Sequence, residues 1–271
     1  METVSATRLT ADAPADTKIE DIPAILLVGG AGTRLRSVVS SAPKPLAAVG
    51  DKPFLELLVR QLRHQGVRRV VMCTGHLADQ VEGSFGDGSG WDLKIDYSRE
   101  TSPLGTAGAL RFALARLDRD SEFLVMNGDS FLEVDFEQML KFHRERGGMV
   151  TMAVIGMQNA SRYGTVQTDG NRRLTAFVEK GSGEGPGLIN GGVYVIDRAL
   201  REYLPERPAS LEKDVLPKVL NHGVYALEQH GMFIDIGTPE DYERAQQLRD
   251  RLYQAALSPL KPECAPPEGS N

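Results

Sequence analysis

The feature that most constrains the fold of this chain is a regular alternation of short apolar runs with helical segments. Residues 24–28 read Ala-Ile-Leu-Leu-Val, an uninterrupted apolar run typical of a strand buried on both faces. This run ends directly in glycines, and a helical pattern and further apolar runs follow it. Such a rhythm predicts a mostly parallel sheet with helices on both faces.

The predicted elements divide the core of the chain into two halves. In the first half, strands are predicted at 24–28, 70–74, 94–97, 123–126 and 149–155, and helices at 53–65, 106–117 and 135–146. The second half has hairpin strands at 163–167 and 174–179, strands at 189–196, 224–228 and 233–236, and helices at 212–221 and 239–253. We expect a nucleotide-binding half at about 22–157 and a mixed half at about 158–254 that holds a second substrate, both on one sheet.

The segments outside this core lack periodic apolar residues. Residues 1–21 are predicted to be a disordered leader and residues 255–271 a flexible tail, because small polar residues and prolines cannot bury enough surface to offset the entropy lost on ordering. No signal-peptide core and no apolar run of about 20 residues is present in the sequence. We therefore expect a cytoplasmic protein without a membrane partner.

The charge and the cysteine content exclude several classes of protein. The chain has 31 Lys and Arg against 37 Asp and Glu, a formal net charge of −6, which argues against nucleic acid as a partner. Small anionic ligands stay open, because a few local cations can hold a phosphate. Cys73 and Cys264 lie too far apart in sequence to indicate a metal cluster or a disulfide framework, and Cys73 is predicted to be a buried, inert thiol.

A glycine-rich loop follows the first predicted strand. It reads Gly29-Gly30-Ala31-Gly32-Thr33-Arg34-Leu35, and its glycines allow the backbone to approach a ligand and present N–H groups to phosphate oxygens. No Gly-Lys-Ser/Thr follows, so the loop is not a Walker A motif. Leu35 stands where a dinucleotide fingerprint requires its third glycine.

Two cations accompany this loop. Arg34 lies inside it, and Lys44 follows in Pro43-Lys44-Pro45, a segment that the prolines keep stiff. Arg suits forked contact with phosphate, and Lys supplies a compact charge. A lone glycine-rich turn is more often just a tight connection, and Lys44 alone more often a solvated lysine. Their combination favours a phosphate site.

The pair Gly-Gly-x-Gly-Thr-Arg-Leu and Pro-Lys-Pro resembles the signature of the sugar-1-phosphate nucleotidyltransferases, and further motifs extend the resemblance over residues 24–250. The resemblance implies a single Rossmann-like α/β sheet of the GT-A-like type, mixed but mostly parallel. It implies that Gly29, Gly30, Gly32 and Thr33 bind the nucleotide, and that Arg34 and Lys44 act on its phosphates. Because some relatives carry an added C-terminal β-helix, the length after Tyr253 predicts a catalytic domain alone.

Two carboxylates are candidates for a metal site. Asp129 in Asn127-Gly128-Asp129 ends a predicted strand at the edge where open α/β sheets bind ligands. Asp235 ends a later strand, and a turn or capping role explains it equally well from sequence alone. Mg²⁺ prefers one or two carboxylates together with phosphate oxygens and water. The resemblance implies that Asp129 and Asp235 bind Mg²⁺ jointly.

A second glycine segment is the candidate contact for the nucleobase. Leu104-Gly105-Thr106-Ala107-Gly108 follows Glu100 and opens a predicted helix, and close helix packing alone could explain its small residues. The resemblance implies that Gly105, Thr106 and Gly108 contact the base. This form is similar to members that use GTP, and Glu100 could accept hydrogen bonds from N1 and N2 of guanine.

Three further motifs are candidates for the sugar pocket. They are Arg162-Tyr163-Gly164, Glu179-Lys180 and Asn190-Gly191-Gly192, the last with two glycines inside a strand, which predicts close approach to the backbone. Without the resemblance, Glu179-Lys180 is best explained as a surface pair. With it, Tyr163, Gly164, Glu179, Asn190 and Gly191 are expected to bind the sugar and Lys180 its phosphate.

The histidines contribute little to this prediction. His64, His143 and His222 are expected to be solvated, and only His76, at the end of a predicted strand, is placed where it could line a cleft. No Ser/His/Asp or Cys/His arrangement is present, which agrees with a reaction that needs no protein nucleophile.

The expected reaction is in-line attack of a sugar 1-phosphate on the α-phosphorus of GTP, with release of pyrophosphate.

The substrate is the least constrained part of the prediction. Arg36-Ser37-Val38-Val39 is similar to the D-glycero-α-D-manno-heptose 1-phosphate guanylyltransferases, which implies GDP-heptose for polysaccharide precursor synthesis. Mannose 1-phosphate or another sugar phosphate is the alternative, and a dimer is expected by analogy. A non-catalytic sugar-nucleotide sensor and a dinucleotide oxidoreductase are weaker alternatives, because the metal and lysine positions are all present and the third glycine is missing.

Overall fold

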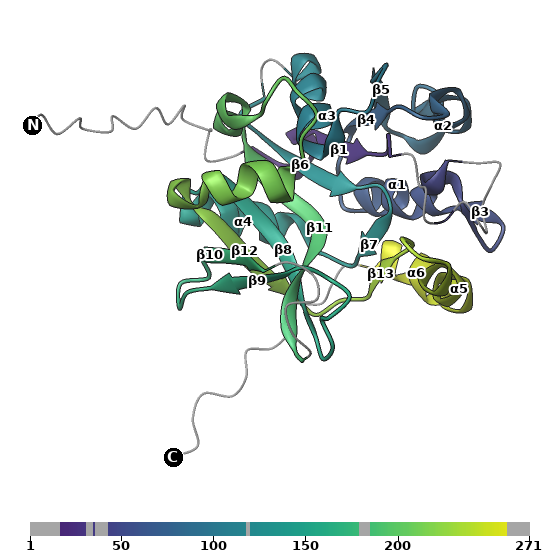
Figure 1. Cartoon of the computed structure of the whole chain (residues 1–271). Helices are drawn as coiled ribbons and strands as arrows, with labels where there is room; N and C mark the ends of the chain where they lie inside the picture. The colour runs from purple at the N-terminus through teal and green to yellow at the C-terminus, as the bar shows by residue number, and fades with distance from the viewer. Residues whose placement is uncertain (1–16, 31–34, 36–42, 118–119, 179–184, 259–271) are drawn as a thin grey trace, which may run out of the picture.

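The computed structural model describes residues 17–30, 35, 43–117, 120–178 and 185–258. Its described part is built on a nine-stranded sheet with helices packed on it (Figure 1). The strand order is β10-β9-β11-β6-β1-β4-β5, and β8 pairs with both β11 and β12. The strands are β1 (Ala24–Leu27), β4 (Arg69–Thr74), β5 (Lys94–Arg99), β6 (Glu122–Asn127), β8 (Val150–Met157), β9 (Thr165–Thr168), β10 (Leu174–Val178), β11 (Gly187–Asp197) and β12 (Val224–Gln229).

The sheet is mixed in the way that the sequence predicts. β1 pairs in parallel with β4 and β6, and β4 pairs in parallel with β5. β11 runs antiparallel to β6, β8 and β9, and joins the parallel half to the hairpin of β9 and β10. Both halves of the chain therefore share one sheet, and the mixed, mostly parallel α/β fold is confirmed.

The apolar core lies on both faces of this sheet. Ala24 and Leu26 of β1 belong to one buried cluster, and Ile25 belongs to the other, because successive side chains of a strand point to opposite faces. The helices of the described chain are α1 (Phe54–His64), α2 (Ala78–Phe85), α3 (Gly105–Ala113), α4 (Phe136–Arg146), α5 (Pro239–Gln247) and α6 (Arg249–Ala256). Side chains of α1 and α4 fill the first cluster, and those of α3 fill the second.

A small ladder outside the main sheet was not fully predicted. β7 (Ser130–Leu132) pairs antiparallel with β13 (Phe233–Asp235), with Ser130 opposite Asp235. The Ile236 amide extends the pairing by donating to the Asp129 carbonyl at 3.0 Å. This ladder brings the two predicted metal carboxylates together, although only the later strand was expected from the sequence. A second short ladder, β2 (Ala48–Val49) with β3 (Lys52–Pro53), precedes α1.

Other predicted elements were wrong in detail. The helix expected at 212–221 is instead a π-helical turn, Leu211–Val215, followed by 3-10 turns at Leu216–Lys218 and Leu220–His222, because Pro217 has no N–H to continue a helix. The helix expected at 239–253 is divided into α5 and α6 at Leu248. Helix α2 was not predicted.

The ends of the core are partly described. Within the predicted leader, Ile19–Asp21 form a 3-10 turn, and the Thr17 carbonyl accepts a hydrogen bond from Arg144 at 3.0 Å. Residues 1–16 and 259–271 lie outside the described residues. Within the described ranges, none of the helices combines the length and the apolar character needed to cross a membrane.

Candidate active site

A cleft of about 1040 Å³ opens where the parallel strands end. The segments that follow β1, β4, β5 and β6 all contribute to its wall, as expected for a ligand site of an open α/β sheet. The volume suits two small substrates, since single-ligand pockets are about 300–1,000 Å³. The predicted site residues that line it are Gly29, Gly30, Lys44, Glu100, Gly105, Thr106, Asp129, Tyr163, Gly164, Asn190 and Asp235.

The remaining predicted site residues do not all reach the cleft. Gly108 and Gly191 are absent from its lining. A Cβ at Gly108 would lie 2.9 Å from Cβ of Leu104, and one at Gly191 would lie 2.5 Å from Cδ2 of Leu132, so close packing accounts for both glycines. Gly32, Thr33, Arg34, Glu179 and Lys180 lie outside the described residues. His76 lines the cleft.

A lysine and an aspartate form the charged centre of the cleft. Lys44 begins the 3-10 turn Lys44–Leu46, directly after Pro43, and its side chain is only 10% exposed. Its Nζ lies 2.6 Å from Oδ2 of Asp129, whose side chain is 42% exposed. A nearly buried cation is therefore fixed against a carboxylate that is open to the cleft.

Asp235 brings a second carboxylate to the same place. Burial raises the pKa of Asp235, the negative charge of Asp129 raises it further, and Lys44 opposes both effects. The Gly237 N–H donates to Oδ1 of Asp235, and a Cβ at Gly237 would lie 2.6 Å from that oxygen. The turn after β13 thus requires glycine in order to hold this carboxylate.

These two carboxylates fit a divalent cation. Mg²⁺ is commonly held by one or two carboxylates, and phosphates and water complete its shell. Among the described residues, no group of three or more His, Cys, Asp or Glu side chains could hold a metal by itself. A metal at Asp129 and Asp235 would therefore depend on the phosphates of the substrate.

Glu100 also lines the cleft and follows β5 directly. Its Oε2 accepts a hydrogen bond from the Leu104 amide at 3.1 Å, and burial raises its pKa. A Cβ at Gly29 or at Gly75 would lie 2.8 or 2.7 Å from Oε1 of Glu100. The glycine at 29 therefore makes room for this carboxylate, in addition to any approach by a ligand.

The start of α3 is tied to a distant loop. Gly105 has φ of +68°, a conformation that side chains rarely adopt, and a Cβ there would lie 2.4 Å from the Ala209 carbonyl. The amides of Ala107 and Ala209 complete the link by donating, each at 2.9 Å, to the carbonyls of Ala209 and Leu104. The predicted base-contacting segment is thus held by residues that follow β11 in sequence.

The side of the cleft assigned to the sugar is built on β11 and on the loop before β9. Tyr163 packs edge-on against Phe233, with ring centroids 6.1 Å apart. Oδ1 of Asn190 accepts from the Gly192 amide at 2.9 Å, and its Nδ2 donates to Oη of Tyr194 at 2.5 Å. The backbone amide of Gly192 therefore orients the asparagine, while glycine itself is needed there because φ is +76° and a Cβ would lie 2.6 Å from Oγ of Ser130.

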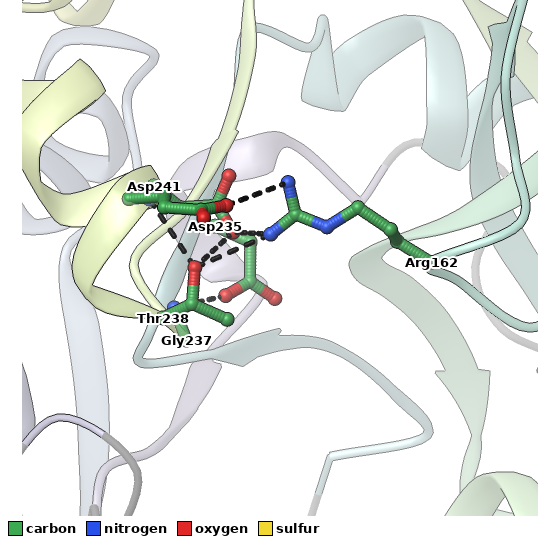
Figure 2. Close-up of polar contacts among 6 residues, drawn as sticks. Arg162, Asp235, Gly237, Thr238 and Asp241 are labelled. Carbon is green, nitrogen blue, oxygen red and sulfur yellow. Dashed lines mark hydrogen bonds and ion pairs between the residues drawn. The ribbon is translucent and has the colours of Figure 1, made fainter.

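Arg162 connects this loop to the start of α5. Figure 2 shows its guanidinium pointing at Asp241 and Thr238, beside the turn that carries Asp235. Nη2 of Arg162 lies 2.8 Å from Oδ2 of Asp241 and 3.2 Å from Oγ1 of Thr238. Thr238 is also the N-cap of α5, where it accepts from the Asp241 amide at 3.2 Å. Arg162 also forms an ion pair with Glu240 at 3.7 Å, so two ion pairs join the loop before β9 to the start of α5.

Comparison with known proteins decides the family. The nucleotidyl transferase family matches residues 23–251, which is most of the chain and includes every element of the cleft described above. The chain belongs to the nucleotidyl transferase family. The fold, the glycine loop and the charged centre all agree with this assignment.

Relatives of this nucleotidyl transferase have been named in several organisms. The chain is 41% identical over 227 residues to a D-glycero-alpha-D-manno-heptose 1-phosphate guanylyltransferase of Aneurinibacillus thermoaerophilus, an alignment that covers 83% of this chain and 96% of the relative. It is 36% identical over 227 residues to a mannose-1-phosphate guanylyltransferase of Mycobacterium tuberculosis, covering 82% of this chain but only 63% of that protein.

Solved structures agree with the fold. HddC from Yersinia pseudotuberculosis, complexed with GMP-PN, has a TM-score of 0.75 and 33% identity to this nucleotidyl transferase, over 83% of this chain and 98% of HddC. A putative glucose-1-phosphate thymidylyltransferase from Bacillus anthracis also has a TM-score of 0.75, at 21% identity over 84% of this chain and 94% of its own. The second likeness shows only the shared fold.

The structure also shows residues of the cleft that the sequence did not reveal. Ser210 and Glu212 line it, and Glu212 accepts hydrogen bonds from side chains of α3 and β11. No local motif marks Glu212, because its partners Thr106 and Tyr194 are far away in sequence. The π-helical turn that carries it replaces a helix expected from the sequence, and such turns are frequent at functional sites.

Proposed function

We propose that this nucleotidyl transferase moves GMP from GTP to D-glycero-α-D-manno-heptose 1-phosphate, giving GDP-heptose and pyrophosphate. The observation that carries the proposal is the meeting of Lys44, Asp129 and Asp235 in one cleft large enough for both substrates. The names of the Aneurinibacillus and Mycobacterium relatives, both guanylyltransferases, support nucleotidyl transfer from GTP.

The chain's own residues would act mainly by position and charge. Gly29, Gly30 and Lys44 line the cleft. The backbone of the two glycines would approach the triphosphate, and the charge of Lys44 would offset that of the transferred phosphoryl group. Arg34 would hold the phosphates beyond the glycines, and Lys180 would align the attacking sugar phosphate. Asp129 and Asp235 would hold Mg²⁺, which when bound neutralises phosphate charge.

Guanine is the proposed base because of Glu100. This carboxylate lies in the cleft, close to Gly29. Its Oε2 accepts from the Leu104 amide, and among the described residues none donates a hydrogen bond to its Oε1. Guanine carries N–H donors at N1 and N2 that can meet such an acceptor. Uracil and thymine lack this pair of donors, so the same site would discriminate against UTP and dTTP.

Heptose is preferred to mannose on the strength of the relatives. The chain spans nearly the whole of the heptose relative but less than two thirds of the mannose relative, and identity is higher to the first. Tyr163, Gly164 and Asn190 line the part of the cleft proposed for the sugar. Mannose 1-phosphate remains the alternative substrate. A cytoplasmic location, where both substrates would be made, agrees with this function.

A substrate matrix tests the proposal. GTP, ATP, UTP and dTTP are each combined with heptose, mannose and glucose 1-phosphates in the presence of Mg²⁺, and pyrophosphate release is measured. We expect release with GTP and heptose 1-phosphate well above every other pair. Preference for UTP or dTTP would overturn guanine, and preference for mannose 1-phosphate would overturn heptose.

Matched variants link the activity to the cleft. Asp129→Asn and Lys44→Met are expected to lower kcat by about 100-fold or more, since each removes charge at the reacting phosphates. Asp79→Asn and Lys94→Met are suitable controls, because both residues lie outside the cleft lining. Normal turnover by both cleft variants would contradict the assignment of the site.

A further inference from the structure

A chain of side-chain hydrogen bonds links several residues that line the cleft. Nδ2 of Asn190 donates to Oη of Tyr194 at 2.5 Å, and Tyr194 donates to Oε1 of Glu212 at 2.9 Å. The other oxygen of Glu212, Oε2, accepts from Oγ1 of Thr106 at 3.2 Å and from Oγ of Ser210 at 2.9 Å. This chain runs from β11 to the first turn of α3.

The direction of these bonds is fixed by their chemistry. An ionised Glu212 can only accept, so Tyr194 and Thr106 both direct their hydroxyl hydrogens toward it. Burial raises the pKa of Tyr194 well above its usual range, and the charge of Glu212 adds to this effect, so the phenol stays a donor. Because the hydroxyl hydrogen of Tyr194 is donated to Glu212, Oη of Tyr194 can only accept from Asn190. The NH₂ end of the Asn190 side chain must therefore face Tyr194.

The second end of Asn190 is fixed in the same way. Oδ1 of Asn190 accepts from the Gly192 amide at 2.9 Å, so both ends of the side-chain amide are assigned and it cannot turn over without losing two hydrogen bonds. At the other end of the chain, Oγ1 of Thr106 accepts from the Leu211 amide at 2.7 Å while it donates to Glu212. Each member therefore depends on the orientation of the next.

Tyr194 cannot take part in binding directly. Its relative exposure is 0%, and it is absent from the lining of the cleft, whereas Asn190, Thr106 and Glu212 all line it. A hydroxyl that no ligand can reach has only the other side chains to act upon. Its effect on substrate binding must pass through Asn190 or Glu212.

We propose that Tyr194 and Glu212 are positioning residues that fix the side-chain orientations of Asn190 and Thr106. Glu212, the acceptor shared by Tyr194 and Thr106, thereby determines the geometry of both the sugar side and the nucleotide side of the cleft. The inference rests on the proposed function, with Asn190 at the sugar and Thr106 at the nucleotide, the roles that the family resemblance implies. It goes beyond that function by assigning the geometry of both subsites to Glu212.

Steady-state kinetics with single variants test the inference. Tyr194→Phe removes only the hydroxyl, and we expect the KM for the sugar phosphate to rise about fivefold to tenfold, the effect of one lost hydrogen bond, while the KM for GTP and kcat stay within about twofold. Glu212→Ala is expected to raise both KM values by at least this factor. Glu212→Gln keeps the size and one acceptor oxygen, so it should recover part of the loss.

A matched control separates positioning from a general loss of stability. Tyr97→Phe also removes a tyrosine hydroxyl that is hydrogen-bonded, here to the Gly86 carbonyl at 2.6 Å, but Tyr97 does not line the cleft. We expect both KM values of this variant to match wild type. A purely structural role for Tyr194 would lower the yield or the melting temperature and leave the KM values of the folded protein unchanged, which would overturn the inference.

Hydrogen exchange in the absence of substrates decides the inference independently of the proposed function. In Tyr194→Phe and Glu212→Ala, the Gly192 amide should exchange faster than in wild type, because its acceptor Asn190 is released, whereas Tyr97→Phe should leave it unchanged. Unaltered exchange at Gly192 would overturn the inference. If wild type released no pyrophosphate from any substrate pair, the proposed function would fail, and the exchange result would still stand for or against the positioning role.

Discussion

In the folded chain the carboxylate of Asp235 is buried and lies near the negative charge of Asp129. Both effects raise its pKa, and Lys44 compensates for only part of them. A raised pKa means that the native state binds the proton more tightly than the unfolded state does. The contribution of Asp235 to the free energy of unfolding therefore falls as the pH rises above the pKa of an unfolded aspartate. The site is therefore built at a cost in stability, which a bound cation would offset.

Replacing Asp235 tests this balance. In the absence of divalent metal at pH 7, Asp235→Asn is expected to unfold at higher urea concentration than wild type, because no buried charge has to be held beside Asp129. The difference should shrink as the pH falls to about 4, near the pKa of an unfolded aspartate. Chemical unfolding with EDTA over this pH range measures it.

The same variant, although more stable without metal, should respond less to Mg²⁺ and be less active than wild type. Added Mg²⁺ should raise the melting temperature of wild type more than that of Asp235→Asn, and kcat should fall in the variant. Asp79→Asn, whose side chain is 83% exposed, serves as the control. A variant that is less stable than wild type at pH 7, or one stabilised equally by Mg²⁺, would contradict the roles given to Asp235.

His143 is a residue for which the sequence-based expectation was wrong. It was expected to be solvated, but it is 4% exposed on the inner face of α4, and its Nδ1 lies 3.0 Å from Oγ1 of Thr151. Burial, with a smaller contribution from Arg144, lowers its pKa to about 4. The sequence did carry a sign of this, because His143 follows Met139 by four residues and Leu140 by three, which places it on the apolar face of α4 that packs on the sheet.

This histidine predicts sensitivity to acid. Because its pKa is lower in the native state, the unfolded chain takes up the proton first, and stability is lost as the pH falls below about 6.5. We expect His143 to account for a loss of about 2 kcal/mol in the free energy of unfolding between pH 7 and pH 5. His143→Gln, which retains hydrogen-bonding groups, should lose less over this range, and parallel curves for the two proteins would disprove the assignment.

At the scale of elements, the sequence predicted strands better than it predicted their side-chain networks. Apolar runs such as 24–28 and 70–74 are long enough to identify buried strands, and β1 and β4 lie there. Strand β7 has three residues and follows Gly128-Asp129, so it leaves no periodic pattern to detect. Its pairing with β13 is a long-range property, as is the network around Glu212.

The ion pair of Arg162 belongs to this scale, because it joins two elements. Its side chain is 51% exposed, so Arg162→Met is expected to change the free energy of unfolding by no more than about 1 kcal/mol. The variant should instead raise the KM for the sugar phosphate several-fold, since Tyr163 would lose its link to the start of α5. Kinetics of pyrophosphate release measure this.

A double-mutant cycle makes the test specific. Asp241→Asn should resemble Arg162→Met, and the double variant should be no worse than either single one, because both break the same link. Arg99→Met is the control, since it breaks the exposed pair of Arg99 with Asp79 away from the cleft. Additive effects of the two single variants would show that the link is not what matters.

At the scale of the whole molecule, an acidic chain is expected to handle several anions. The formal net charge is −6, yet Lys44 is fixed in the cleft beside the carboxylates. The sequence predicts two more cations for the same site, Arg34 and Lys180, which lie outside the described residues. Local placement of charge, more than net charge, therefore determines which ligands such a protein can take.

The site was predicted from sequence mainly through spacing motifs. Asp129 was expected in the cleft because it ends a strand at the ligand-binding edge of the sheet, Lys44 because of its stiff Pro-Lys-Pro segment near the glycine loop, and Glu100 because of the family resemblance. All three line it. Gly108 and Gly191 were also expected there, but they are not among the residues that line it, and close contacts with neighbouring side chains are enough to require glycine at both positions. A motif shows that a glycine is needed but does not show whether a ligand or a neighbour needs it.

The central claim is that the cleft transfers a nucleotidyl group, and the fate of the phosphates of GTP tests it most directly. With GTP radiolabelled at the α-phosphate and a sugar 1-phosphate present, we predict that the label enters the nucleotide sugar, and that GTP labelled at the γ-phosphate gives labelled pyrophosphate. Asp129→Asn should abolish both transfers. Label from the γ-phosphate on the sugar, or GTP that binds without either label moving, would contradict the account.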